Sequence, residues 1–201
     1  MRPRCRPGEV ASPVDGVDGP RSGPDAARGV PWVTASVVTL AALAHFVPGS
    51  AEILEYEREA VSGGEAWRLL SGSFTHWTDR MAAWDLGVAL IVGLWLERRA
   101  PRAARAVWLV SSVTIGAVLW LALPDVSHYR GASGVASALY VALAIGLLRG
   151  GPRRARRVAG AALALFVAKV ARDALAGIPL AAGTLPPGVN VLWEVHLAGG
   201  L

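Results

Sequence analysis

Residues 128–148 read HYRGASGVASALYVALAIGLL, a polar stretch that passes directly into a long apolar run. The run approaches the ~20 apolar residues that a helix needs to cross a bilayer. Small residues recur in it at four-residue spacing, which is typical of membrane helices that pack closely: Ser133 with Ser137, and Gly134 with Ala138. The stretch therefore predicts a membrane helix with a close neighbour, and it raises the question whether Ser133 is also a nucleophile.

Similar apolar segments recur along the chain, which is 53% hydrophobic and 17% charged. Six are expected to form helices: 30–47, 81–96, 103–123, 131–148, 158–178 and 189–201. The composition predicts an all-α membrane protein with a transmembrane domain over 30–201. At ~1.5 Å per residue the sixth segment covers only about 20 Å of a ~30 Å hydrocarbon core. The last helix is therefore expected to be truncated, either because the chain is a fragment or because the helix ends in mid-membrane.

Arginines supply nearly all of the net charge of +5, and they cluster in three stretches: 1–29, 97–105 and 149–157. Short loops rich in Arg and Lys stay on the cytoplasmic side of a membrane. The alternate connections 49–80, 124–130 and 179–188 lack such clusters. This alternation predicts six crossings with the N-terminus in the cytoplasm. It also argues against nucleic-acid binding, because the basic loops are short and separate instead of forming one patch.

Two segments outside the apolar runs, 1–29 and 49–80, are not expected to cross the membrane. Residues 1–29 are rich in Pro, Gly, Asp and Arg without an apolar face, which predicts a disordered cytoplasmic tail. The lone Cys5 in this tail cannot form an internal disulfide. The connection 49–80 is either an amphipathic piece on the outer interface, with Trp67 and Trp77 at headgroup depth, or a packed extracellular loop.

Polar side chains inside membrane helices are costly and are candidates for function. The predicted topology places Ser133, His196, His76 and Asp85 in the outer half of the membrane. Ser133 with His196 would make a nucleophile and its general base. Gly131 and Gly134 would let another backbone approach and leave a free amide at a helix start for an oxyanion. The alternative is that the small residues form only a helix seam.

Other ionisable side chains have structural interpretations. His45, near the outer end of the first segment, is a competing base, although such a histidine is more often simply hydrated. Lys169 and Asp173 stand four residues apart and are expected to neutralise each other, with Lys169–Glu194 as the alternative pair. Arg172 is expected to extend outward. No metal site or cofactor is predicted.

The chain resembles the rhomboid family of intramembrane serine proteases, and within it the rhombosortase branch. The resemblance covers roughly 52–201, and four motifs carry it: EAWRLLSGSFTH (65–76), WDL (84–86), YRGASGV (129–135) and EVHLAG (194–199). Rhomboids carry G-x-S-G at the start of the fourth core helix and a histidine followed by small residues in the sixth. The resemblance implies a six-helix rhomboid-like bundle with Ser133 as nucleophile and His196 as general base.

The resemblance also implies a substrate and a location. Rhombosortases are thought to cleave membrane-anchored proteins that carry a C-terminal Gly-Gly motif, a transmembrane helix and a basic end. The expected location is a bacterial inner membrane, with the active site facing the periplasm and the lipid bilayer as the other partner. Gly131, Gly134, His76 and Asp85 would support the oxyanion.

Two positions depart from the rhomboid pattern. Where rhomboids have an oxyanion-binding histidine and asparagine, this chain has Met81 and Asp85. Methionine cannot donate a hydrogen bond, and an aspartate helps only if it is protonated or orients a donor. A second hypothesis is therefore a catalytically impaired relative that binds membrane helices. A third, a small transporter using Asp85, Lys169 and Glu194, lacks the inverted repeats that it would need.

Overall fold

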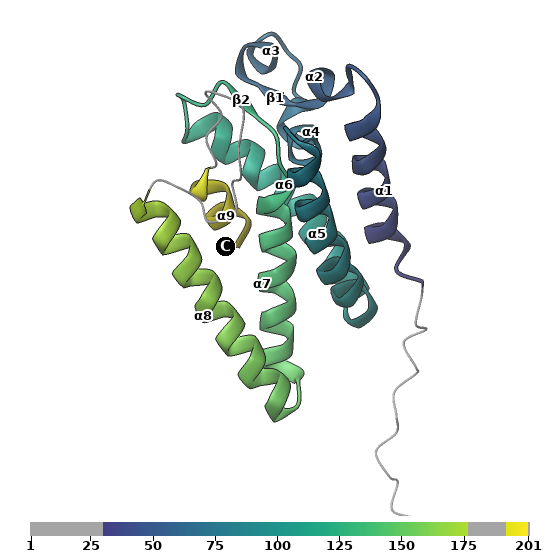
Figure 1. Ribbon diagram of the computed structural model, residues 1–201, viewed down its shortest axis with the longest axis vertical. Coiled ribbons are helices and arrows are strands. Elements are labelled where there is room, and N and C mark those ends of the chain that lie inside the picture. Colours follow the sequence, from purple (N-terminus) through teal and green to yellow (C-terminus); the bar gives the residue numbers. More distant parts are fainter. Residues whose placement is uncertain (1–29, 177–191, 201) are drawn as a thin grey trace, which may run out of the picture.

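The chain folds into a helical bundle, seen here in a computed structural model that describes residues 30–176 and 192–200 (Figure 1). The prediction of an all-α protein is confirmed for this part of the chain. Six longer helices fall on the six apolar segments: α1 (Trp32–Phe46), α5 (Asp79–Arg99), α6 (Pro101–Leu121), α7 (Ser133–Gly150), α8 (Arg153–Ala176) and α9 (Trp193–Gly200). The predicted tail 1–29 and the connection 179–188 lie outside the described residues.

Local chemistry sets several helix ends. The Thr78 side chain accepts a hydrogen bond from the Met81 amide (3.2 Å) and so begins α5. Pro101 occupies the first turn of α6, where its missing N–H is not needed. The sharp turn between α7 and α8 follows Gly150, and a side chain on Gly151 would lie 2.5 Å from the Leu147 carbonyl oxygen. The arginine-rich connections predicted from the sequence therefore coincide with helix–helix turns.

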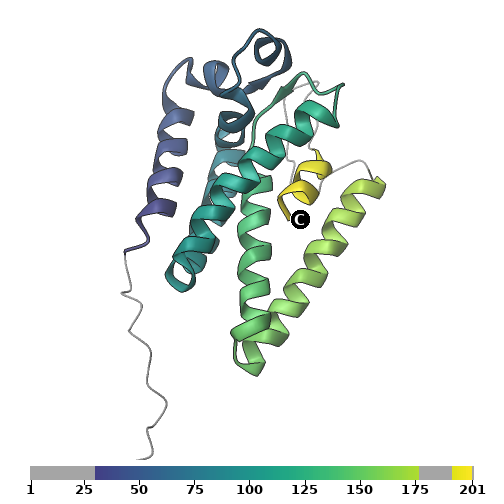
Figure 2. The same cartoon turned by 180° about the vertical axis from the view of Figure 1, so that it is seen from behind.

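Helix α7 is the centre of the bundle and contacts α5, α6, α8 and α9. In both views α9 lies between α7 and α8 (Figures 1 and 2). The buried apolar residues of α7 recur every four positions, as one face of a helix requires: Val135, Leu139, Leu143 and Leu147. The segment quoted first is thus the helix around which the others pack.

Helix α1 is attached to α5 by one buried carboxylate. The Glu97 side chain accepts hydrogen bonds from the amides of Val33 (3.1 Å) and Thr34 (2.8 Å). These amides have no partner inside α1 because they belong to its first turn. The Thr34 hydroxyl in turn accepts a hydrogen bond from the Trp108 indole at 3.2 Å. An acidic side chain from α5 therefore caps α1, an arrangement that the sequence pattern does not reveal.

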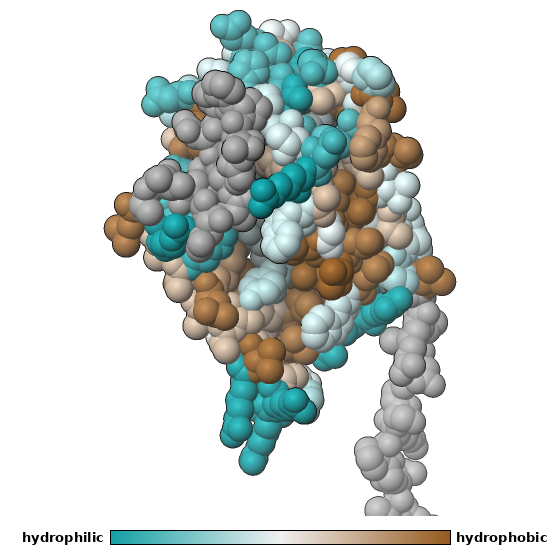
Figure 3. Space-filling view, in the orientation of Figure 1, coloured by the Kyte–Doolittle hydropathy of each residue, from teal (hydrophilic) through white to brown (hydrophobic). Residues whose placement is uncertain are grey.

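Two helices in the described part, α6 and α7, are long and apolar enough to cross a membrane, and α1 is a shorter apolar helix. The space-filling view shows apolar side chains across the middle of one face and polar side chains at both ends (Figure 3). The turns α5–α6 and α7–α8 lie at the same end of the bundle (Figure 1). Both arginine-rich connections are therefore at one end, as the charge pattern predicts.

The opposite end carries a polar cap, defined here as residues 49–78 together with strand β2. It consists of short elements: α2 (Ser50–Leu54), β1 (Tyr56–Glu57), α3 (Arg58–Ser62), α4 (Arg68–Ser71), the 3₁₀ turn η1 (Gly72–Phe74) and β2 (His128–Tyr129). β1 pairs antiparallel with β2, with Tyr56 opposite Tyr129. The connection is thus a series of short packed elements, and its placement on the outer interface or outside the membrane stays a prediction.

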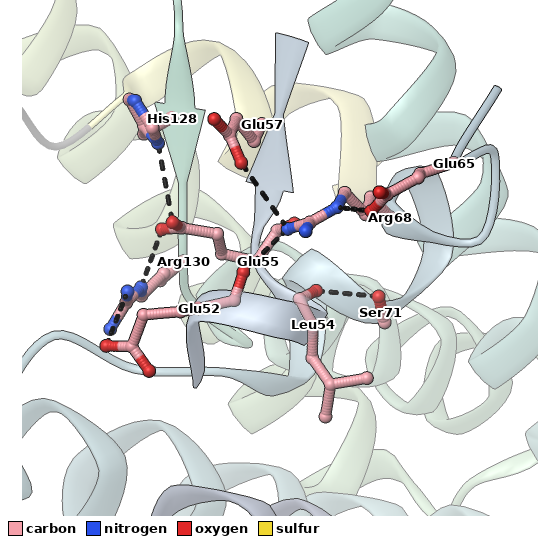
Figure 4. Close-up of polar contacts among 9 residues, drawn as sticks. All are labelled: Glu52, Leu54, Glu55, Glu57, Glu65, Arg68, Ser71, His128 and Arg130. Atoms are coloured by element: carbon pink, nitrogen blue, oxygen red, sulfur yellow. Dashed lines mark hydrogen bonds and ion pairs between the residues drawn. The ribbon is translucent and has the colours of Figure 1, made fainter. Parts of the chain in front are cut away.

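Arginines hold the polar cap together (Figure 4). Arg68 pairs with Glu65 (2.6 Å) and donates to the carbonyl of Glu52 (2.7 Å). Arg130 pairs with Glu55 at 2.8 Å and stacks on the Trp77 ring at 4.4 Å. Because Arg130 directly precedes Gly131, these contacts fix the backbone that leads into α7.

Candidate active site

The backbone just before α7 turns sharply at Gly131, whose φ of +150° favours glycine. The Tyr129 hydroxyl donates to the Gly131 carbonyl (2.7 Å), and the Gly131 amide donates to the Gly72 carbonyl (3.3 Å). A side chain on Gly131 would lie 2.7 Å from the Met81 methyl group. Ser133 follows as the first residue of α7 and is half-buried. The turn therefore holds Ser133 at the end of the bundle that carries the polar cap.

Helices α7 and α9 touch backbone to backbone. A side chain on Gly134 would lie 2.8 Å from the Val195 carbonyl oxygen, and one on Gly199 would overlap the carbonyl of Gly134. Only glycine permits this approach at either position. The predicted close seam between the Ser133 helix and the His196 helix is thus present in the structure.

This contact places His196 against the first turn of α7. Its Nδ1 lies 3.2 Å from the Ser137 hydroxyl oxygen, and the same hydroxyl donates to the Ser133 carbonyl at 2.8 Å. The ring also lies close to the Ser133 backbone. In residues 30–176 and 192–200, no hydrogen bond joins the Ser133 hydroxyl itself to His196. The structure thus brings Ser133 and His196 into one site, with Ser137 as the direct partner of the imidazole.

Asp85 and His76 lie on the other side of the Ser133 turn. The Asp85 carboxylate lies beside the backbone amides of Ala132 and Ser133. Its Oδ2 is 3.7 Å from His76 Nε2, which is too long for a hydrogen bond. His76 is completely buried, and burial, followed by the nearby His45, lowers the pKa of its imidazole to about 4. A neutral His76 therefore lies next to the Asp85 carboxylate, which borders the amides at the start of α7.

Met81 stands at the position where rhomboids have an oxyanion-binding histidine, and its side chain packs beside the Ser133 turn. Its methyl group packs against Gly131, as the short distance to a side chain built there indicates. A thioether offers no hydrogen to an oxyanion. Met81 therefore adds no donor to the Ser133 turn, and oxyanion binding by the Ser133 amide and His76 stays a prediction.

His45 corrects one expectation. It is not simply hydrated, because its side chain is only 9% exposed and its Nε2 lies 2.8 Å from Asp79. Its ring meets that of His76 in an edge-to-face arrangement, with the two centroids 6.0 Å apart. This pairing with Asp79 and His76 places His45 beside the Asp85 side of the site.

The charged residues of α8 follow the predicted pairing in part. Lys169 forms an ion pair with Asp173 at 2.9 Å, as their spacing predicts. Arg172 was expected only to extend outward, but its guanidinium also contacts Asp173 at 3.1 Å. Glu194 does not pair with Lys169 in the described part of the chain, and its Oε2 is buried there without a hydrogen-bond partner. The group near His196 is therefore the Lys169–Asp173 pair.

Reasoning from sequence assigned no chemical role to two residues of the site, although Ser137 was among the polar candidates. Ser137 was assigned to the helix seam alone, although its spacing from Ser133 already placed it on the same helix face. Tyr129 gave no signal, because its bond to Gly131 depends on the turn; its hydroxyl also lies near the Ser133 side chain. Among the described residues, no group of three or more His, Cys, Asp or Glu side chains is arranged to hold a metal ion.

No known family model matches the chain, and no curated protein or solved structure shows significant similarity to it. The resemblance to rhombosortases therefore rests on the quoted motifs.

Proposed function

We propose that the protein is an intramembrane serine endopeptidase of the rhombosortase type, with Ser133 as nucleophile and His196 as general base. Its substrates are exported proteins anchored by a C-terminal Gly-Gly motif, a transmembrane helix and a basic end. The supporting observation is the backbone contact at Gly134 and Gly199, which holds the His196 ring against the first turn of the Ser133 helix. A serine needs an adjacent base to become a nucleophile.

The reaction proceeds in two halves. The Ser133 Oγ attacks the scissile carbonyl carbon while its proton passes to His196 Nε2. The C–N bond breaks, His196 returns the proton to the departing amine, and an ester of Ser133 remains. Water then attacks the ester, its proton passes through His196 to the Ser133 oxygen, and the new carboxylic acid leaves. The Ser133 amide and His76 are the donors available to the oxyanion in each half.

A membrane setting accounts for the apolar exterior. Large apolar side chains point outward from four helices, a pattern suited to lipid and costly in water; examples are Leu40 on α1, Ile91 on α5, Val110 on α6 and Leu165 on α8. With the arginine-rich turns in the cytoplasm, the polar cap and Ser133 face the periplasm of a bacterial inner membrane. The bundle then corresponds to the rhomboid-like arrangement of six helices.

A fluorophosphonate probe tests the nucleophile directly in the detergent-solubilised full chain. The parent should be labelled and Ser133→Ala should not. His196→Ala should label about 10²–10⁴-fold more slowly, the usual contribution of a general base. Ser112→Ala is the matched control, because Ser112 is a buried helical serine on α6 whose hydroxyl donates to the Trp108 carbonyl. Equal labelling of the Ser112 and Ser133 variants would reject the proposal. Cleavage of a Gly-Gly-tailed substrate then tests specificity.

One observation favours a second function, a binding protein for membrane helices without protease activity. Met81 packs against Gly131 where a donor would otherwise reach the oxyanion. One missing donor costs about 10²–10³ in turnover. If the protein is only a binder, Met81→His should leave a Gly-Gly-tailed substrate bound and uncut. Cleavage gained by Met81→His would exclude the binder.

A further inference from the structure

Ser137 carries two contacts through a single hydroxyl group. It lies one helical turn after Ser133 and is buried between α7 and α9. Its Oγ is 2.8 Å from the Ser133 carbonyl oxygen and 3.2 Å from His196 Nδ1. It is the one side chain in the described residues that is hydrogen-bonded to this imidazole.

Counting hydrogens fixes the direction of both bonds. A carbonyl oxygen only accepts, so the Ser137 hydroxyl must donate its one hydrogen to Ser133. The Ser137 oxygen can then only accept from His196, which requires the ring hydrogen to be on Nδ1. In a neutral imidazole, Nε2 is left with a free lone pair. The hydrogen bond thus selects one of the two tautomers.

We propose that Ser137 is a positioning residue that holds His196 as its Nδ1–H tautomer, so that Nε2 can take the proton of Ser133. This inference rests on the proposed protease function for its role, but the tautomer itself does not depend on activity. An imidazole with its hydrogen on Nε2 could not act as base through that nitrogen. The Ser137 hydroxyl thus performs a task often given to a buried carboxylate.

The His196 ring also lies close to the Ser133 backbone, and Ser137 is the side chain hydrogen-bonded to it among the described residues. The backbone contact at Gly134 and Gly199 fixes the distance between the two helices, so the ring cannot move away from α7. His196 itself is 7% exposed, which leaves little room for water to compete. The charged pair Lys169–Asp173 lies nearby on α8, with its two charges bonded to each other.

The tautomer can be measured by NMR in the detergent-solubilised full chain with ¹⁵N-labelled histidine. The chain has 4 histidines, and the His196 signals are those lost in His196→Gln. The parent should show a protonated Nδ1 and an unprotonated Nε2. Ser137→Ala should lose this preference, and Ser137→Thr, which keeps the hydroxyl, should retain it. Ser112→Ala should match the parent, since it removes a comparable bond to Trp108 without touching a histidine.

Labelling by the fluorophosphonate probe links the tautomer to reactivity. Ser137→Ala should react at least about 10-fold more slowly than the parent, a fraction of the total that a general base contributes, and Ser137→Thr should recover the rate. An Nε2–H tautomer in the parent would overturn the inference without need of any variant. So would an unchanged tautomer in Ser137→Ala. Labelling that persists in Ser133→Ala would instead reject the protease function and leave the tautomer result standing.

Discussion

At the scale of single residues, buried polar atoms around the Ser133 turn lack hydrogen-bond partners. Both ring nitrogens of His76 and Oδ2 of Asp85 are buried without a partner in the described residues. Such atoms cost free energy in a folded protein and are retained where they serve a purpose. Asp85 lies beside the Ser133 amide and His76 lies next to Asp85, so binding of an oxyanion or a water molecule there would account for these atoms.

His76 should make stability depend on pH. Its folded-state pKa of about 4 lies below the 6.5 of an unfolded histidine, so the unfolded chain binds the proton more readily. Stability from this group is complete above pH 6.5 and is lost as the pH falls toward 4. At pH 4.5 the loss should be on the order of 2–3 kcal/mol.

The comparison of the parent with His76→Gln isolates this effect. Chemical unfolding in detergent between pH 7 and pH 4.5 should show a smaller loss for His76→Gln than for the parent. The absolute stability of the variant is irrelevant, because the pH dependence is compared. Equal pH dependence in both proteins would contradict the prediction.

At the scale of helices, the packing of α9 on α7 depends on glycines at their contact. Gly199→Ala places a methyl group on the Gly134 carbonyl and must push α9 away from α7. We expect a loss of about 1–3 kcal/mol in unfolding free energy, as overpacking usually costs, together with loss of probe labelling. Gly146→Ala in α7 is the control, because a side chain there meets nothing within 4 Å. That variant should be neutral or more stable by about 0.5–1 kcal/mol. Equal stabilities would contradict the close seam.

A second prediction at this scale concerns the Glu97 carboxylate, which attaches α1 to α5. Glu97→Ala leaves the buried amide of Thr34 and the partly buried amide of Val33 without this acceptor, which should cost about 1–3 kcal/mol. Glu97→Gln keeps one acceptor oxygen and should lose less. Chemical unfolding in detergent, followed by the tryptophan fluorescence of the whole chain, would report the change. If the Ala and Gln variants are equally stable, Glu97 does not hold α1.

Sequence reasoning located the long helices because each carries a continuous apolar run bounded by Arg, Gly or Pro. It did not find the Glu97 cap or the folding of the polar cap. Arg58 shows why: its guanidinium donates to carbonyls at the end of α6, including Trp120 and Leu123, more than 60 residues away. A long-range bond of this kind leaves no periodic signal. Likewise, the sequence singled out Ser133 and His196 by their residue types and positions. The Ser137–His196 contact depends on how α7 and α9 cross, which the sequence does not show.

At the scale of the whole molecule, the two ends of the bundle differ in charge, which predicts its orientation. In a Cys5→Ser background, Glu52→Cys in the polar cap and Arg105→Cys at the α5–α6 end offer exposed single thiols. A membrane-impermeant maleimide should label Glu52→Cys in spheroplasts and Arg105→Cys only after the membrane is permeabilised. The reverse pattern would contradict the assigned topology.

The glycine contact between α7 and α9 has a consequence for genetics. A saturation library scored for proteolysis would show Gly199 as intolerant as His196, although no atom of Gly199 takes part in the chemistry. Scoring the same library for protein abundance would separate them. Variants at Gly199 should disappear from the membrane, because the helices no longer fit. His196→Ala should accumulate as an inactive protein, and only the pair of scores tells a catalytic position from a steric one.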